Sequence, residues 1–104
     1  FANTAMKKAG TANYETIKGW FSETLPDCKF ENGISILRLD GDWYESTMDC
    51  LSNLYDKVNT GGLIIIDDYY AWDGCSRAVH DFLSSRNLVS RIRQFNNDVC
   101  YIIK

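Results

Sequence analysis

Two short apolar runs that each end in paired carboxylates constrain the fold of this chain more than any other feature. Residues 34–39 lead into Asp40-Gly41-Asp42, and residues 63–66 lead into Asp67-Asp68. A continuous apolar run rich in β-branched residues is typical of a buried strand, and in open α/β sheets ligands bind at the carboxyl ends of the strands. Two such strands side by side would therefore direct all four acids at one crevice.

The four carboxylates need a partner in such a crevice, because like charges that lie close together repel one another unless a cation or protons intervene. Asp40 and Asp42 alternate with Gly41, so on an extended backbone they point the same way. Hard oxygen ligands of this kind suit Mg²⁺, Ca²⁺ or Mn²⁺ rather than zinc. The alternative is that the acids only cap the helices that follow, as Asp often does. Doubled acids at both strand ends favour the metal.

The rest of the pattern predicts a single α/β domain over residues 1–104 in which helices alternate with strands. The predicted helices cover residues 1–9 and 44–58, and a third, capped by Asp73, contains residues 75–83. The predicted strands cover residues 14–20, 34–40, 63–67, 90–95 and 99–104, with turns at 59–62 and 96–98. We expect a mainly parallel sheet with an antiparallel hairpin at its C-terminal end.

Length, charge and cysteine content exclude several classes of protein. The 104 residues make one domain, and a net charge of -3 without a basic block argues against a nucleic-acid partner. The apolar runs are too short to span a membrane. None of the four cysteines belongs to a C-x-x-C pair or has a histidine at zinc spacing, so we expect reduced, buried thiols in a cytoplasmic protein. The chain starts at Phe1, inside a predicted helix, which indicates a fragment of a longer protein.

Other side chains near the acids have two interpretations each. Aromatic rings beside a polar site suit flat ligands or sugar faces, although they also pack helix starts. Arg38 shares a strand face with Asp40, which favours a structural ion pair. His80 lies off the apolar stripe of its helix, so we expect a solvated surface residue rather than a base. No serine or cysteine has a histidine and an acid arranged around it as a nucleophilic triad. The flanking aromatic residues are Trp43, Tyr44, Tyr69, Tyr70 and Trp72.

At these motifs the sequence resembles the macrocin O-methyltransferase (TylF-type) family of class I methyltransferases. The longest matching stretch is LRLDGDWYEST at residues 37–47, and GWFSETLP precedes it at residues 19–26. Gly61-Gly62 and the IDDY of residues 66–69 follow, and Cys75 with RAV at residues 77–79 extends the match. The resemblance covers nearly the whole chain in order.

The resemblance implies a Rossmann-like enzyme that uses S-adenosylmethionine (SAM) and Mg²⁺ to methylate a hydroxyl group, typically on a sugar of a glycosylated natural product. By that similarity Asp40, Asp67 and Asp68 would bind the metal, and Asp42 would be the base on the substrate hydroxyl. The acceptor would be a small molecule, with no nucleic acid or membrane as partner.

The chain departs from the family in its N-terminal part. The family has a first strand with a glycine-rich loop that holds SAM, and a second strand with an acid for the ribose. This sequence has no G-x-G-x-x-G, and neither strand is present. We therefore expect the C-terminal part of a Rossmann-like methyltransferase domain that lacks the first two strands. Alone, such a chain is not expected to bind SAM or to turn over.

The sequence is compatible with two other functions. One is a truncated, non-catalytic α/β domain that binds a divalent cation or a partner chain. The other is a phosphoryl-transfer enzyme, which ranks last because the sequence has no P-loop and no Lys and Ser/Thr at further strand ends. Without its neighbours, the strand at residues 34–40 would become an open apolar edge, so we expect self-association through it or repacking of residues 1–21 over it.

Overall fold

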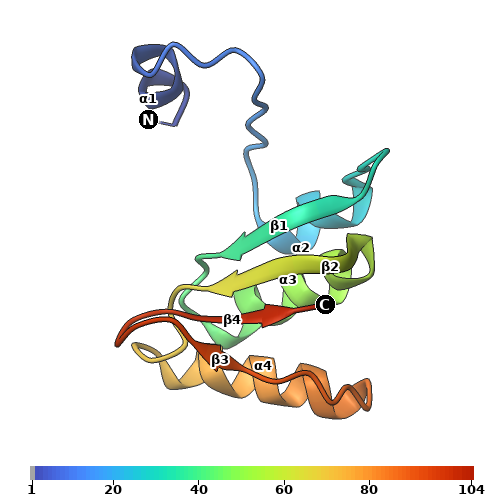
Figure 1. Cartoon of the computed structure of the whole chain (residues 1–104). Helices are drawn as coiled ribbons and strands as arrows, with labels where there is room; N and C mark the ends of the chain where they lie inside the picture. Colours follow the sequence, from blue (N-terminus) through green and yellow to red (C-terminus); the bar gives the residue numbers. More distant parts are fainter. Residues whose placement is uncertain (1) are drawn as a thin grey trace.

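The computed structural model describes residues 2–104 of the chain (Figure 1). Four α-helices and four strands follow one another along the sequence, with a 3-10 turn after each of the second and third helices. The helices are α1 (Ala2–Lys8), α2 (Phe21–Thr24), α3 (Tyr44–Leu54) and α4 (Asp73–Ser85), and the 3-10 turns are Leu25–Asp27 and Tyr55–Lys57. The strands are β1 (Ile34–Leu39), β2 (Val58–Ile66), β3 (Arg93–Gln94) and β4 (Cys100–Ile103).

The strands form one sheet in the order β1-β2-β4-β3. This confirms the α/β fold that the sequence predicts, with four of the five predicted strands in one sheet. The expectation of a mainly parallel sheet is wrong for the described residues, because only β1 and β2 pair in parallel while β4 is antiparallel to both β2 and β3. The C-terminal hairpin supplies half of the strands, which makes the sheet mixed.

The core lies between the sheet and the helices. Helices α2 and α3 lie behind the sheet in Figure 1, and α4 runs beside α3 below β3. Along β1, Leu37 and Leu39 are buried while Ile36 and Arg38 are exposed, so one face of the strand carries the core. Helix α4 buries the stripe that its periodicity predicts, namely Cys75, Ala78, Val79, Phe82 and Leu83. The helices therefore cover one face of the sheet, and the strands are not buried on both faces as their sequence suggests.

Residues 14–20 are not a strand, contrary to the prediction. They run as an extended segment between α1 and α2 and pair with no strand of the described chain. Their alternating pattern fits a strand, but a strand needs a neighbour for its backbone hydrogen bonds. Helix α1 stands apart from the sheet and buries none of its residues (Figure 1). Its predicted first residue, Phe1, lies outside the described residues.

Four other boundaries differ from prediction. Helix α3 ends at Leu54, and β2 starts at Val58, so residues 59–62 belong to β2 rather than to a turn. The pairing of β1 with β2 shifts register between Ile34 and Ile36, which accommodates these residues. Asp73 is the first residue of α4 and not its cap, because the N-cap is Trp72 and no side chain caps the helix. Strand β3 is shorter than predicted.

All four cysteines are free thiols. Cys50, Cys75 and Cys100 are buried, as expected, and Cys28 is half-buried. Burial raises the pKa of the Cys50 and Cys100 thiols to about 11, so both are protonated at neutral pH. No helix within residues 2–104 has the length and apolar character needed to cross a membrane.

Candidate functional site

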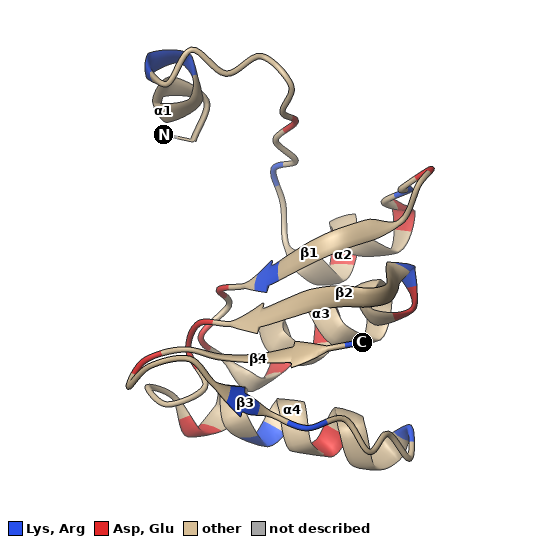
Figure 2. Cartoon of the chain, in the orientation of Figure 1, with Lys and Arg blue, Asp and Glu red and all other residues tan. Residues whose placement is uncertain are grey.

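The parallel pairing of β1 with β2 brings the acidic loops together. Leu39 and Ile66 are register partners at the ends of their strands, and the Asp67 N–H extends the ladder by donating to the Leu39 carbonyl oxygen at 3.1 Å. Both strands therefore end at the same edge of the sheet. Figure 2 shows acidic residues at this edge, with a basic residue beside them near the end of β1, a strand in which Arg38 is the only basic residue.

Three carboxylates converge at this edge. Asp40, Asp42 and Asp68 each offer an oxygen atom, and the three atoms lie within 4.8 Å of one another. The Asp42 N–H also donates to the Asp68 carboxylate at 3.3 Å. Asp42 has a left-handed backbone with φ of 60°, which Asp tolerates better than most residues. The loop conformation thus carries the Asp42 carboxylate toward the acids at the strand ends.

Asp67 lies outside this cluster and pairs with Arg38. The Arg38 guanidinium is also 3.6 Å from the Asp40 carboxylate, so it bridges the two acids that begin the two loops. The structural ion pair predicted for Arg38 is confirmed. Of the three predicted metal ligands, Asp40 and Asp68 lie together with Asp42, the predicted base. The third predicted ligand, Asp67, is paired with Arg38 instead.

The clustered carboxylates are electrostatically unfavourable. Desolvation by the surrounding protein raises the pKa of Asp40 even though the residue is exposed, and the nearby Asp68 charge raises it further. Partial burial also raises the pKa of Asp68, and its contact with Asp42 adds to that effect. A cation placed among the three oxygens would relieve this repulsion, and oxygen-only donor sets suit magnesium. The donor set therefore fits a hard divalent ion.

Two hydrogen bonds tie the acidic loops to α4. The Tyr44 hydroxyl donates to Asp81 at 2.9 Å, which fixes the first residue of α3. The Tyr69 hydroxyl and His80 Nε2 lie 2.7 Å apart, which ties the residue after Asp68 to the same helix. His80 is exposed, as the sequence predicts, but its partner was not predicted. These pairs join residues far apart in the chain, and nothing in the linear pattern marks them.

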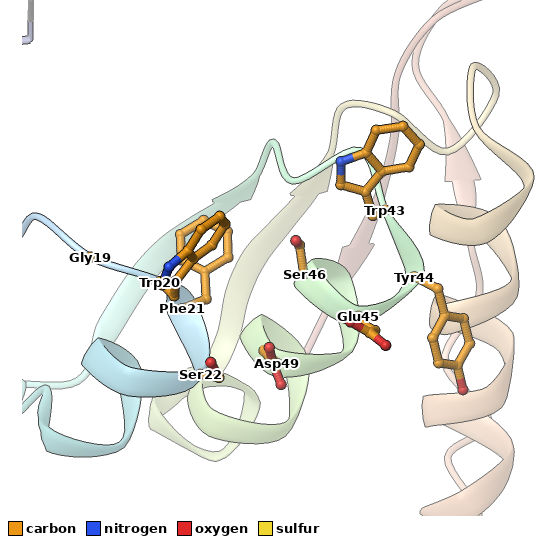
Figure 3. Close-up of a pocket in the computed structure, with 9 residues that line it drawn as sticks. All are labelled: Gly19, Trp20, Phe21, Ser22, Trp43, Tyr44, Glu45, Ser46 and Asp49. Atoms are coloured by element: carbon orange, nitrogen blue, oxygen red, sulfur yellow. The ribbon is translucent and has the colours of Figure 1, made fainter.

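An open cleft lies beside the acidic loops, between α2 and the start of α3 (Figure 3). Its volume is about 580 Å³. Sequence analysis singled out Trp43 and Tyr44 but missed Trp20 and Phe21, because it placed Trp20 in a strand. The lining residues are Gly19, Trp20, Phe21, Ser22, Trp43, Tyr44, Glu45, Ser46 and Asp49.

The fold is that of an α/β methyltransferase. The solved structure of the O-methyltransferase NovP matches 99% of this chain with a TM-score of 0.88 and 33% sequence identity, over 42% of its own length. The calicheamicin methyltransferase CalS11 matches 84% of the chain with a TM-score of 0.71. At 22% identity, CalS11 supports the fold alone.

Residues 10–104 match the model of the macrocin O-methyltransferase (TylF) family, and the chain belongs to this family. It is 39% identical over 85 residues to the demethyldecarbamoylnovobiocin O-methyltransferase of Streptomyces niveus, covering 82% of this chain and 32% of that enzyme. It is 50% identical over 66 residues to the 8-demethyl-8-(2,3-dimethoxy-alpha-L-rhamnosyl)-tetracenomycin-C 4'-O-methyltransferase of Streptomyces olivaceus, covering 64% of this chain and 24% of that enzyme. The chain thus spans about a third or less of the length of these relatives.

Proposed function

We propose that this chain is the metal-binding part of a SAM- and Mg²⁺-dependent O-methyltransferase that acts on a sugar hydroxyl of a glycosylated natural product. The convergence of Asp40, Asp42 and Asp68 at the carboxyl edge of the sheet is the observation that carries the proposal. Family membership supports methyl transfer and the use of SAM. The names of the relatives, which include a rhamnosyl acceptor, support a sugar.

The proposed roles of the acids follow from their positions. Asp40 and Asp68 would hold Mg²⁺, and Asp67 would join them by leaving Arg38, which bridges Asp67 and Asp40. Bound Mg²⁺ would orient an acceptor hydroxyl and lower its pKa. Asp42, one residue beyond Gly41, would accept the hydroxyl proton as general base. The tie from Tyr44 to Asp81 would keep the Asp42 loop in place.

The residues of this chain do not make a recognisable SAM site. The class I fold holds the cofactor with a glycine-rich loop after a strand, and the sequence contains no G-x-G-x-x-G. The chain contributes the acidic edge of the sheet and the adjoining cleft.

Titration calorimetry of the purified chain with Mg²⁺ tests the metal site. We expect Asp40→Asn, Asp67→Asn and Asp68→Asn each to weaken binding about ten-fold or more, or ~1.4 kcal/mol. Asp42→Asn should weaken Mg²⁺ binding less than Asp40→Asn or Asp68→Asn, because asparagine tolerates the left-handed backbone and the change removes a nearby charge but not a proposed ligand. Affinity should fall on acidification, since the pKa values of Asp40 and Asp68 are raised and protons compete for the same oxygens.

Asp27→Asn is the matched control, because Asp27 is an exposed acid in the 3-10 turn after α2 and lies outside the cluster. It should bind Mg²⁺ like the unmodified chain. Equal affinity in all of these variants would contradict a metal site at this edge. If Asp42→Asn weakened Mg²⁺ binding as much as Asp40→Asn does, Asp42 would be a metal ligand and not the base.

A non-catalytic α/β domain that binds a partner chain is the second candidate, and one observation favours it. Strand β1 pairs only with β2 within the described chain, so its outer edge is open. Ile36 on this strand is 63% exposed. Open apolar edges pair with other chains, so we propose that the isolated chain self-associates there.

A further inference from the structure

We infer that His80 is a positioning residue, which holds the Asp68 carboxylate in the acidic cluster through its hydrogen bond with Tyr69. The inference rests on the proposed function and deepens it by giving helix α4 a role at the proposed metal site. The Tyr69 hydroxyl and His80 Nε2 lie 2.7 Å apart, and the two ring centres lie 5.8 Å apart at a tilt of 51°. His80 acts through Tyr69 and touches neither metal nor substrate.

The sheet alone does not fix the direction of the Asp68 side chain. The ladder between β1 and β2 ends where the Asp67 N–H donates to the Leu39 carbonyl oxygen at 3.1 Å. Beyond it, the Asp68 carbonyl oxygen accepts hydrogen bonds from the Ala71 and Trp72 N–H groups at 3.2 and 3.0 Å, which close a turn before α4. These two bonds hold the turn together but do not orient it. A contact between the turn and the rest of the fold is needed for that.

Asp68 lies between two residues that are each held by a partner. Asp67 pairs with Arg38 on one side, and Tyr69 is tied to α4 on the other. With both neighbours anchored, the Asp68 side chain is directed toward Asp42, whose N–H donates to the Asp68 carboxylate at 3.3 Å. Loss of the Tyr69 contact would release one of the two anchors.

Helix α4 holds both acidic loops through consecutive residues. His80 contacts Tyr69 in the loop after β2, and Asp81 accepts a hydrogen bond of 2.9 Å from Tyr44, which follows the loop after β1. The helix buries an apolar stripe in the close-packed core, so it is a rigid support. Because both loops are tied to the same turn of one helix, α4 sets the spacing between their carboxylates.

The exposure of the pair argues against a role in stability alone. Water competes for both groups of an exposed hydrogen bond, so such a bond adds little to the free energy of folding. The Tyr69 ring packs partly against the core and edge-on against the Tyr70 ring at 4.9 Å, and neither contact needs the hydroxyl group. The hydroxyl group therefore contributes direction rather than burial, and Tyr69→Phe would break the tie while leaving the ring packed.

Variants of the purified chain test the inference with two readouts. The first is the exchange rate of the Asp42 amide hydrogen, measured by NMR without metal, because this N–H donates to the Asp68 carboxylate. The second is Mg²⁺ affinity from titration calorimetry. We expect Tyr69→Phe and His80→Leu each to speed this exchange and to weaken Mg²⁺ binding about five-fold, equivalent to ~1 kcal/mol. The double variant should show no larger effect than either single one, because both changes break the same bond.

His80→Gln should restore both readouts, because a glutamine side chain can reach the position of Nε2 and both donates and accepts hydrogen bonds. Tyr70→Phe is the matched control, since it removes a hydroxyl group from the next residue and keeps the edge-on contact. Gly62→Ala controls for a general loss of stability, because its methyl group would meet the Asn59 and Ser35 carbonyl oxygens rather than the acidic loops. Both controls should match the unmodified chain in both readouts.

Unchanged Asp42 exchange in Tyr69→Phe, or unchanged affinity in a chain that binds Mg²⁺, would overturn the inference. Additive effects in the double variant, or equal losses in His80→Gln and His80→Leu, would do the same. The exchange readout needs no metal, so it separates this inference from the proposed function. Faster exchange in a chain that does not bind Mg²⁺ would support the positioning role and refute the metal site. Intact Mg²⁺ binding with unchanged exchange in every variant would refute the positioning role alone.

Discussion

At the scale of single residues, Arg38 governs the charge of the acidic edge. Its guanidinium bridges Asp67 and Asp40, where a cation shared by those two acids would lie. The side chain is 58% exposed, so it can leave the acids at small cost, since exposed ion pairs are worth about 0–1 kcal/mol. Arg38 therefore competes with a metal ion for the same oxygens.

We predict that Arg38→Gln increases Mg²⁺ affinity up to about five-fold, because the variant removes a competing cation worth at most ~1 kcal/mol. Titration calorimetry at fixed ionic strength measures the change. Arg77→Gln is the matched control, since Arg77 carries the same charge but contacts Asp81 on α4. Equal Mg²⁺ affinities of the two variants would mean that only the net charge of the chain affects binding. A lower Mg²⁺ affinity in Arg38→Gln than in the unmodified chain would mean that Arg38 is part of the metal site.

The positions of single acids were predictable only in part. Strand ends in parallel register bring Asp40 and Asp68 to one edge, and that follows from the apolar runs. The partner of each carboxylate depends on the direction of its side chain in the loop beyond the strand. In that loop, the left-handed backbone of Asp42 directs its carboxylate toward the acids at the strand ends. Asp67, next in sequence to Asp68, instead meets Arg38. Alternation along a strand does not specify directions in the loop that follows it.

At the scale of elements, residues 59–62 show how tertiary packing overrides local turn signals. Asn59-Thr60-Gly61-Gly62 has the composition of a turn, yet it extends β2 toward its start. Gly62 is buried against β1, where an added Cβ would meet the Asn59 carbonyl oxygen at 2.7 Å and the Ser35 carbonyl oxygen at 3.2 Å. The glycine is therefore needed for close approach of the backbones rather than for a turn.

We predict that Gly62→Ala lowers the free energy of unfolding by about 1–3 kcal/mol, because the methyl group overlaps backbone atoms that cannot move without shifting the strands. Denaturant unfolding followed by circular dichroism measures this. Thr60→Ala, at an exposed position of the same strand, should stay within about 0.5 kcal/mol of the unmodified chain. Equal stabilities would indicate that residues 59–62 form a loose turn, as the sequence alone suggests.

Elements with strong periodicity were predicted well, and those that depend on a neighbour were not. Helices α3 and α4 start at Tyr44 and Asp73, close to the predicted starts, because their apolar stripes pack on the sheet. Residues 14–20 have an equally clear alternation but no strand to pair with, so they remain extended. An alternating sequence pattern indicates that a segment can form a strand. The segment forms one only where a neighbouring strand is available to pair with it.

At the scale of the whole molecule, one face of the sheet has no helical cover from residues 2–104. Ile36, Leu63 and Ile103 are register partners across three strands on that face, and Ile36 and Ile103 are at least half exposed. Helix α1, which buries none of its residues, stands apart from the sheet in Figure 1. An apolar row that ends at an open strand edge favours association with another sheet.

We therefore predict that the isolated chain dimerises through β1, with Ile36 rows of two copies in contact. Sedimentation equilibrium over a range of chain concentrations should show a monomer–dimer equilibrium. Ile36→Lys should shift it to monomer, because a lysine on an edge strand opposes edge-to-edge pairing. Val89→Lys is the control, since Val89 is fully exposed outside the strands and carries the same substitution of a β-branched residue. A monomer at every concentration, or equal dissociation in both variants, would contradict association through this edge.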